Sequence, residues 1–386
     1  MIKRKLCVVT GTRAEYGLLK HLIKEIDISK DFELILLVTG SHLSKKFGNT
    51  FNEIEDDGFL INRKIDIQII GDKADDIANS TALSIRGFSK AYLNFNPDLV
   101  ILLGDRYELL GAAISAMYHQ IPIAHLHGGE VTIGAMDEGI RHSLTKLSHL
   151  HFVANETYRN RVIQLGENPD LIFNVGGLGV DAIKRIKLLS KVQLEESLDL
   201  KFKDKNLLIT FHPVTLEKST SSFQMKALLN ALAIRNDCQL IFTMPNADPN
   251  SQVLIEMIEC FVKEHNNAFL FTSLGQERYF SCLAQVDAVI GNSSSGLSEV
   301  PSFKKATVNI GDRQKGRLKS SSVIDCEPDV ISINNAIDKI YNKSFQNAVL
   351  KTVNPYGDGG SVELIMKTLN SISFNNLLKK KFYDLA

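Results

Sequence analysis

Acidic side chains and histidines gather in one stretch of the first half of the chain. They are Asp105, Glu108, Glu130, Asp137 and Glu138, together with His125 and His127. Carboxylates that share a partly desolvated site take separate pKa values, so that one accepts a proton while another donates one. We interpret the group as acid–base machinery with Asp105, Glu130, Asp137 and His127 as catalytic candidates. Glu138 is better explained as a charge at a helix N-terminus.

The same side chains raise the alternative of a metal site. His125 and His127 are two residues apart at the end of a predicted strand. If the strand pattern continues to His127, both rings point to one face and could bind zinc or manganese. A third ligand at a supporting spacing is missing from the sequence. The sequence therefore predicts acid–base chemistry without a metal.

A row of small hydroxyl residues stands between Gly291 and Gly296 in the second half. Amides and hydroxyls at the start of a helix donate hydrogen bonds to phosphate oxygens, which predicts that Ser293 and Ser294 bind a diphosphate. Glu299, one turn later, is placed to accept hydrogen bonds from ribose hydroxyls. A serine-rich helix cap is the alternative explanation.

Three arginines and one histidine lie on loops next to strand ends. Arg13, Arg313 and Arg317 stand in glycine-bounded loops, where a guanidinium group can hold phosphate oxygens with two donors. Surface ion pairs would explain each of them equally well. His212 ends a predicted strand and either donates a proton to a leaving group or only bonds the backbone.

The common nucleotide-binding motifs are missing. The sequence has neither GxGxxG nor GxxxxGK[ST], and after the two glycines of segment 311–316 Arg317 and Leu318 replace the required Lys and Ser/Thr. Segment 291–296 reads GxSxxG and not the GxSxG of an α/β-hydrolase. These absences argue against a dinucleotide dehydrogenase, a P-loop NTPase and a hydrolase with a nucleophile elbow, and no cofactor is predicted.

Short apolar runs alternate with helical patterns along the chain and predict an α/β fold. Continuous apolar runs are typical of parallel strands that are covered on both faces. Predicted strands cover 6–10, 32–39, 99–103, 122–126 and 151–154, and in the second half 207–211, 239–244, 268–272, 288–290 and 306–310. The polar clusters follow these strands, at the sheet edge where open parallel sheets bind ligands.

The two series of strands predict two Rossmann-like domains that face each other across a cleft. Residues 1–180 form the first, with the catalytic carboxylates, and residues 181–365 form the second, which binds the nucleotide. Residues 366–386 are predicted to form a C-terminal helix and a basic tail.

Composition excludes several classes of protein. The 386 residues contain 44 Lys and Arg against 44 Asp and Glu, so there is no net positive charge to attract nucleic acid or an anionic membrane. Apolar runs are far shorter than the roughly 20 residues of a membrane helix. Five cysteines without CxxC spacing fit reduced thiols, and we expect a cytoplasmic protein.

Taken together, the motifs resemble those of the hydrolysing UDP-N-acetylglucosamine 2-epimerases. The resemblance runs from about residue 2 to residue 356 and rests on GTRAEYGLL, VTGSHLSKKFGNT, LGDRYE, HLHGGE, MDEGIRHSLTKLSHLHF, RVIQLGE, FHPVT, PNADP, GNSSSGLSEVPS and NIGDRQKGR. It implies a glycosyltransferase-B-like architecture. It also implies UDP elimination to a 2-acetamidoglucal, followed by water addition, with no redox cofactor and no required metal.

The resemblance implies roles for single residues. Asp105 and Asp137 match acidic residues of proton transfer, and His212 matches the family's cleft histidine. Arg13, Ser293, Ser294, Glu299 and Arg317 match positions that hold UDP, and Asn246 is a weaker match for a uridine or diphosphate contact. Relatives of the non-hydrolysing and animal types carry Glu at the position of His127, whereas here the nearest carboxylate is Glu130, which leaves open which residue takes that role.

The main hypothesis is therefore conversion of UDP-N-acetylglucosamine to UDP and N-acetylmannosamine, the first step of sialic acid biosynthesis. The alternative is the same reaction on UDP-2,4-diacetamido-2,4,6-trideoxyglucose, as in the legionaminic acid pathway. A retaining glycosyltransferase and a non-catalytic UDP-sugar sensor are the hypotheses from other classes. Relatives suggest a homodimer or homotetramer.

Overall fold

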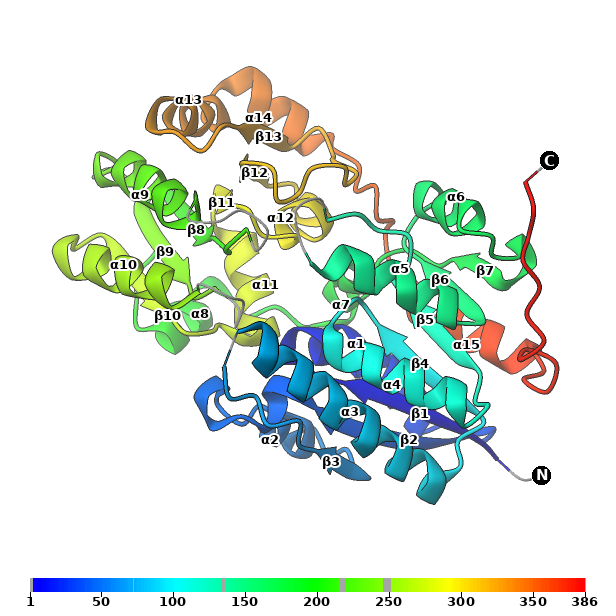
Figure 1. Cartoon of the computed structure of the whole chain (residues 1–386). Coiled ribbons are helices and arrows are strands. Elements are labelled where there is room, and N and C mark those ends of the chain that lie inside the picture. The colour runs from blue at the N-terminus through cyan, green and yellow to red at the C-terminus, as the bar shows by residue number, and fades with distance from the viewer. Residues whose placement is uncertain (1–2, 72, 133–135, 215–219, 246–250, 386) are drawn as a thin grey trace. The chain divides into compact units, whose positions relative to one another are not determined.

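The computed structural model describes residues 3–71, 73–132, 136–214, 220–245 and 251–385. The chain forms two compact units (Figure 1). The first consists of residues 1–130, 137–182 and 359–386, and the second of residues 131–136 and 183–358. Each unit is built on one parallel sheet, which confirms the predicted α/β class with two Rossmann-like domains.

The first unit has a seven-stranded sheet in the order β3-β2-β1-β4-β5-β6-β7. The strands are β1 (Arg4–Thr10), β2 (Phe32–Thr39), β3 (Arg63–Ile65), β4 (Leu99–Leu103), β5 (Ile123–Leu126), β6 (Leu150–Val153) and β7 (Ile172–Asn174). The order reverses between β1 and β4, and in a doubly wound sheet this switch point is where ligands bind.

Helices cover both faces of this sheet. They are α1 (Arg13–Asp27), α2 (Phe51–Asp56), α3 (Ala74–Phe95), α4 (Tyr107–Tyr118), α5 (Asp137–Leu147), α6 (Glu156–Gln164), α7 (Leu178–Arg185) and α15 (Ser361–Ser371), with the 3₁₀ turns η1 (Gly40–Leu43), η2 (Lys45–Phe47) and η3 (Pro169–Leu171). Because side chains alternate along a strand, Leu6 and Val8 of β1 enter one core with α1 and α15. Cys7 and Val9 enter the opposite core with α3, α4 and α5.

The C-terminal helix α15 belongs to the first unit. Val362, Ile365 and Leu369 of α15 pack in the same core as Leu19 of α1. The amides of Gly360 and Ser361 donate to Oδ1 of Asp181 at 2.6 and 2.9 Å. The predicted limit of the second domain at residue 365 therefore differs from the structure, since an apolar helical stripe does not by itself reveal which sheet it covers.

The segment after α15 is held on the first unit by a buried ionic cluster. Lys380 Nζ lies 2.7 Å from Oε2 of Glu167 and donates to the carbonyls of Lys146 and Ser148 at 2.6 and 2.7 Å. His151 Nε2 lies 3.0 Å from the same Glu167 oxygen. Burial raises the pKa of Glu167, but hydrogen bonds from His151, Lys146 and Lys380 lower it overall, to about 2.

The second unit has a six-stranded sheet in the order β10-β9-β8-β11-β12-β13, which repeats the doubly wound pattern with its switch point between β8 and β11. Its strands are β8 (Asn206–Thr210), β9 (Gln239–Thr243), β10 (Ala268–Phe271), β11 (Ala288–Gly291), β12 (Ala306–Ile310) and β13 (Val323–Cys326). Its helices are α8 (Lys191–Leu198), α9 (Thr220–Ala233), α10 (Ser251–Glu264), α11 (Gly275–Gln285), α12 (Ser295–Ser298), α13 (Val330–Ile340) and α14 (Lys343–Leu350), with the turn η4 (Val300–Phe303).

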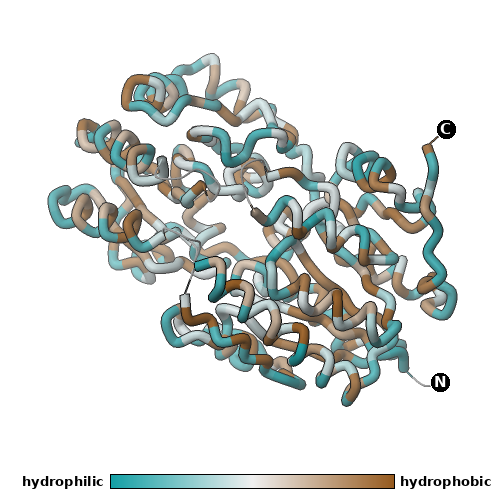
Figure 2. Tube along the Cα trace, viewed as in Figure 1, coloured by the Kyte–Doolittle hydropathy of each residue, from teal (hydrophilic) through white to brown (hydrophobic). Residues whose placement is uncertain are grey.

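Hydrophobic residues concentrate along the strands of both sheets, as Figure 2 shows. Strands β8, β9, β11 and β12 are buried along their whole length, as are β4, β5 and β6 in the first unit. Among the described residues, no helix combines the length and the hydropathy that crossing a membrane requires.

Candidate active site

Arg141 of α5 connects the acidic residues of the first unit. Its side chain is 2% exposed and forms ion pairs with Asp105, just after β4, and with Glu138. Its Nη1 atom also donates to the backbone carbonyl of Glu130 at 3.1 Å. Burial by itself lowers the pKa of Arg141, but the nearby carboxylates of Asp105, Glu130 and Glu138 raise that pKa overall. The guanidinium group therefore stays charged and fixes the position of Asp105.

His127 and Glu130 form a hydrogen-bonded pair in the turn after β5. Nδ1 of His127 lies 3.1 Å from Oε1 of Glu130, and Nε2 lies 3.4 Å from the amide nitrogen of Leu178. An amide can only donate, so Nε2 is the acceptor and Nδ1 carries the hydrogen. In this tautomer His127 donates to the Glu130 carboxylate, which is buried.

His125 does not join His127. Its ring is buried in β5, with Nε2 2.7 Å from the carbonyl of Gly104 and Nδ1 3.2 Å from Oγ1 of Thr145. Burial lowers the pKa of His125 to about 4, so the ring is neutral at physiological pH. His127 lies beyond the strand at φ 64°, where strand alternation no longer applies. The shared face that the strand pattern predicted for the two histidines was therefore wrong.

Asp137 and Glu138 occupy the first turn of α5, where the helix dipole favours acidic side chains. Asp137 is half-buried and precedes Arg141 by four residues, so the two share a helix face. Glu138 does more than charge the helix end, because it also lies 3.1 Å from Nε2 of His142. In the part of the chain that the structure describes, no group of three or more His, Cys, Asp or Glu side chains could hold a metal ion.

A second pair of buried carboxyl groups lies at the switch point of the first sheet. The amide of Gly11 donates to Oε2 of Glu15 at 2.8 Å, and Oε1 of Glu108 accepts from Nε of Arg106 at 2.8 Å. A Cβ on Gly11 would stand 2.6 Å from Oε1 of Glu108, so any larger residue there would displace the Glu108 carboxylate. Burial, and then the nearby Glu108, raise the pKa of Glu15 to about 8.

Glu15 was not predicted from the sequence as an acid with a raised pKa. Thr12 is the N-cap of α1 and its Oγ1 accepts from the amide of Glu15 at 3.2 Å, so the spacing fits an ordinary capping box. The Glu15 carboxyl instead bonds Gly11, in the turn after β1. Its place directly after the first strand of the sheet was the available signal. Arg13 is the first residue of α1, beside this turn.

Asn292 ties together three loops of the second unit. Its Oδ1 accepts from the amide of His212 at 2.7 Å, and its Nδ2 donates to the His212 carbonyl at 2.8 Å. The carbonyl of Asn292 accepts from Nη1 of Arg313 at 3.1 Å and from Nε2 of Gln314 at 2.8 Å. The loops after β8, β11 and β12 therefore converge, which brings His212, Arg313 and the serine row together.

The serine row begins a helix of only one turn. Ser294 is the N-cap of the four-residue helix α12, so the helix dipole adds little, and any phosphate would depend on local amides and hydroxyls. Ser295 donates to the carboxylate of Glu299, and its Oγ lies 2.6 Å from the hydroxyl of Tyr279. Gly291 is required before this turn, because a Cβ there would lie 2.0 Å from the carbonyl oxygen of Thr210.

Arg317 makes two hydrogen bonds that the sequence did not indicate. Its Nε donates to the carbonyl of Val131 at 2.9 Å, and its Nη2 donates to Oγ1 of Thr132 at 3.0 Å. Asn246, the weaker candidate for nucleotide contact, lies outside the described residues.

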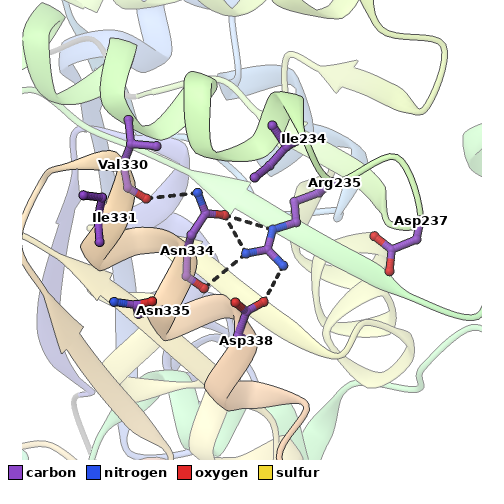
Figure 3. Close-up of a pocket in the computed structure, with 8 residues that line it drawn as sticks. All are labelled: Ile234, Arg235, Asp237, Val330, Ile331, Asn334, Asn335 and Asp338. Atoms are coloured by element: carbon purple, nitrogen blue, oxygen red, sulfur yellow. Dashed lines mark hydrogen bonds and ion pairs between the residues drawn. The ribbon is translucent and has the colours of Figure 1, made fainter.

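A pocket of about 400 Å³ in the second unit contains none of the predicted site residues. Figure 3 shows the residues that line it. Its lining comes from the segment that follows α9 and from α13: Ile234, Arg235, Asp237, Val330, Ile331, Asn334, Asn335 and Asp338. Arg235 donates to Asn334 through Nε and Nη2 and to Asp338 through Nη1. We therefore do not assign this pocket to the reaction.

Comparison with known proteins identifies the family. The sequence profile of UDP-N-acetylglucosamine 2-epimerase matches residues 24–370. The chain is 42% identical to the GDP/UDP-N,N'-diacetylbacillosamine 2-epimerase (hydrolyzing) of Campylobacter jejuni, covering 100% of both chains. It is 38% identical to polysialic acid biosynthesis protein P7 of Escherichia coli, covering 99% of this chain and 98% of the relative. It is 36% identical to the UDP-N,N'-diacetylbacillosamine 2-epimerase (hydrolyzing) of Legionella pneumophila, covering 98% of each.

Solved structures show the same fold. The UDP-GlcNAc 2-epimerase of Neisseria meningitidis bound to UDP-GlcNAc superposes with a TM-score of 0.83 at 18% identity, covering 95% of this chain and 100% of that one. The S. aureus MnaA–UDP structure superposes with a TM-score of 0.82 at 19% identity, covering 99% and 100%. The predicted glycosyltransferase-B-like fold class is confirmed. This chain belongs to the hydrolysing branch of the UDP-N-acetylglucosamine 2-epimerase family.

Proposed function

We propose that the chain is a hydrolysing 2-epimerase of UDP-2,4-diacetamido-2,4,6-trideoxyglucose, also called UDP-N,N'-diacetylbacillosamine. The observation that carries this proposal is the full-length identity of 42% and 36% to two relatives named for that activity. From the sequence alone this substrate is the alternative, and UDP-N-acetylglucosamine is the main hypothesis. The relatives support it better than that first choice.

The reaction consumes one water molecule. In the first step the C2 proton is removed and the bond between C1 and the diphosphate oxygen breaks, which releases UDP and leaves a 2-acetamidoglycal. In the second step the oxygen of water adds to C1 and a proton is delivered to C2 from the opposite face. The products are UDP and the free 2-epimer of the sugar, so the site must supply both a proton acceptor and a proton donor.

The first unit offers three carboxylates for these proton transfers. Asp105 is fixed by its ion pair with Arg141, and Asp137 lies on the same helix as Arg141. Glu130 accepts the hydrogen of His127 Nδ1, which supports Glu130 as the reacting group and His127 as the residue that orients it. Of the two residues between which the sequence left the third catalytic role open, we therefore assign that role to Glu130.

The second unit offers the groups for the nucleotide. Ser293, Ser294 and Arg313 lie in loops that Asn292 ties to His212, so phosphate donors and a proton donor for the leaving group would share one site. We assign Glu299 to the ribose hydroxyls. Arg13 and Asn246 complete the proposed set of UDP-sugar contacts.

The test is product analysis of the purified chain in heavy water, with the UDP- and GDP-linked diacetamido sugar and UDP-N-acetylglucosamine supplied separately. We expect UDP release from the UDP-linked diacetamido sugar and solvent deuterium at C2 of the product. In Asp105→Asn, turnover should be abolished while UDP affinity changes by no more than a few-fold. Loss of UDP affinity in that variant would instead indicate a structural role for Asp105.

UDP-N-acetylglucosamine is the second candidate substrate. The Escherichia coli relative, 38% identical, is named for polysialic acid biosynthesis. In the main hypothesis from the sequence, sialic acid biosynthesis begins with UDP-N-acetylglucosamine. Release of UDP and N-acetylmannosamine from UDP-N-acetylglucosamine alone would overturn the diacetamido proposal. UDP binding without turnover of any donor would favour the sensor. A homodimer or homotetramer stays a prediction, which light scattering would check.

A further inference from the structure

Two arginines hold consecutive peptide carbonyls next to the proposed reacting carboxylate. Nη1 of Arg141 donates to the carbonyl of Glu130 at 3.1 Å, and Nε of Arg317 donates to the carbonyl of Val131 at 2.9 Å. Nη2 of Arg317 continues to Oγ1 of Thr132 at 3.0 Å. The backbone from Glu130 to Thr132 is therefore held by two guanidinium groups from elements far apart in the sequence.

The contacts of Arg317 lie directly after Glu130 in the chain. Segment 131–136 belongs to the second unit, whereas Glu130 and Asp137 at its two ends belong to the first. Arg317 lies in the loop after β12 of the second unit, close in sequence to Arg313. It therefore fixes Val131 and Thr132 to the unit proposed to bind the nucleotide, one residue away from a carboxylate proposed to move a proton.

The guanidinium group of Arg317 is suited to holding a peptide in one orientation. Its donors lie in one rigid plane, and here two of them reach acceptors on adjacent residues, which fixes the orientation of the peptide as well as its position. The side chain of Thr132 is buried, 5% exposed, as is that of Glu130, 7% exposed. A lysine at position 317 would carry the charge but not the planar pair of donors.

We propose that Arg317 is a positioning residue for Glu130, and that its contribution to the reaction is to hold Val131 and Thr132 and not to bind the diphosphate. The inference rests on the proposed function for its catalytic readout. A displacement of about 1 Å in a reacting group can lower the rate about 100-fold, so loss of this anchor should reduce turnover strongly.

The test compares three variants of the full chain. Arg317→Ala removes both donors, Thr132→Val removes only the hydroxyl acceptor, and Lys315→Ala removes an exposed charge from the same loop as the matched control. Arg317→Ala should lower kcat about 100-fold, with little change in the inhibition constant of UDP. Thr132→Val should lower kcat by less, and Lys315→Ala should equal the wild type. Added guanidinium ion at low millimolar concentration should restore part of the kcat of Arg317→Ala.

Hydrogen–deuterium exchange of the substrate-free protein supplies a second readout. Peptides that cover Glu130–Thr132 should exchange faster in Arg317→Ala than in the wild type or in Lys315→Ala. A large rise in the UDP inhibition constant with kcat unchanged at saturating substrate would overturn the proposal and make Arg317 a nucleotide ligand. Unchanged exchange would overturn it as well. If the wild type turns over neither sugar nucleotide, the proposed function fails, while the exchange result still decides whether Arg317 anchors the segment.

Discussion

His127 donates a hydrogen bond to Glu130, with 3.1 Å between Nδ1 and Oε1, while its other ring nitrogen accepts the amide of Leu178. Both ring nitrogens of His127 therefore already take part in hydrogen bonds within the protein. A base must present a lone pair to the substrate proton, and neither ring nitrogen of His127 has one left to offer, which favours the Glu130 carboxylate as the base. The geometry gives the two residues different roles although they are only three positions apart.

The first prediction separates these roles. Glu130→Gln should lower kcat by about 10²–10⁴-fold, the contribution of a positioned acid–base group. His127→Asn should lower it less, because Glu130 keeps its carboxylate but loses one partner. UDP release at saturating substrate measures both. His119→Asn is the control and should retain wild-type activity, because the His119 ring contacts Ser89 and Tyr92 and none of the proposed site residues. A larger loss in His127→Asn than in Glu130→Gln would reverse the assignment.

The second prediction concerns the nucleotide. Glu299 accepts from Ser295, and we assign its carboxylate to the ribose hydroxyls. A hydrogen bond to a charged group contributes about 1.5–3 kcal/mol, so Glu299→Gln should weaken UDP binding roughly 10- to 100-fold in calorimetric titration. Ser298→Ala removes a hydroxyl that donates to the carbonyl of Ser294, in the preceding helix turn, and should bind UDP normally. Unchanged UDP affinity in Glu299→Gln, with lower thermal stability, would make Glu299 a structural residue.

The third prediction is a loss of stability in acid. Burial lowers the pKa of His42 and of His125 from 6.5 to about 4. Below pH 6.5 the unfolded chain takes up protons that the folded chain does not, so the free energy of unfolding falls as the pH drops from 6.5 towards 4. Each histidine contributes a slope of up to about 1.4 kcal/mol per pH unit. Urea unfolding across this range should give a shallower slope for His125→Gln; equal slopes would contradict the prediction.

The fourth prediction concerns the C-terminal segment. Lys380 donates to Glu167 and to two backbone carbonyls, whereas the neighbouring Lys381 is exposed. Lys380→Met should lower the free energy of unfolding by about 1–3 kcal/mol, because Glu167 loses a charged partner. Limited proteolysis should then remove the segment faster. Lys381→Met is the matched control. Equal stability and equal proteolysis in both variants would show that the Lys380 contacts do not hold the segment.

The interior strands of both sheets could be predicted from the sequence because they are continuous apolar runs. The three strands that were not predicted are β3, β7 and β13, each at the edge of a sheet. An edge strand is covered less completely, and Arg63–Ile65, Ile172–Asn174 and Val323–Cys326 each mix buried with partly exposed or exposed residues. Their short and mixed patterns do not differ from those of loops.

The sequence by itself determined which residues stand at the ends of strands, because in a parallel sheet every polar cluster that follows a strand lies at the same edge. Asp105, His127, Glu130, His212 and the serine row were all found in this way. Their partners were decided only by the tertiary structure. The separation of His125 from His127, the raised pKa of Glu15 and the anchoring of Val131 by Arg317 depend on burial and on contacts between segments far apart in the chain. The local spacing of residues carries no information about burial or about contacts between distant segments.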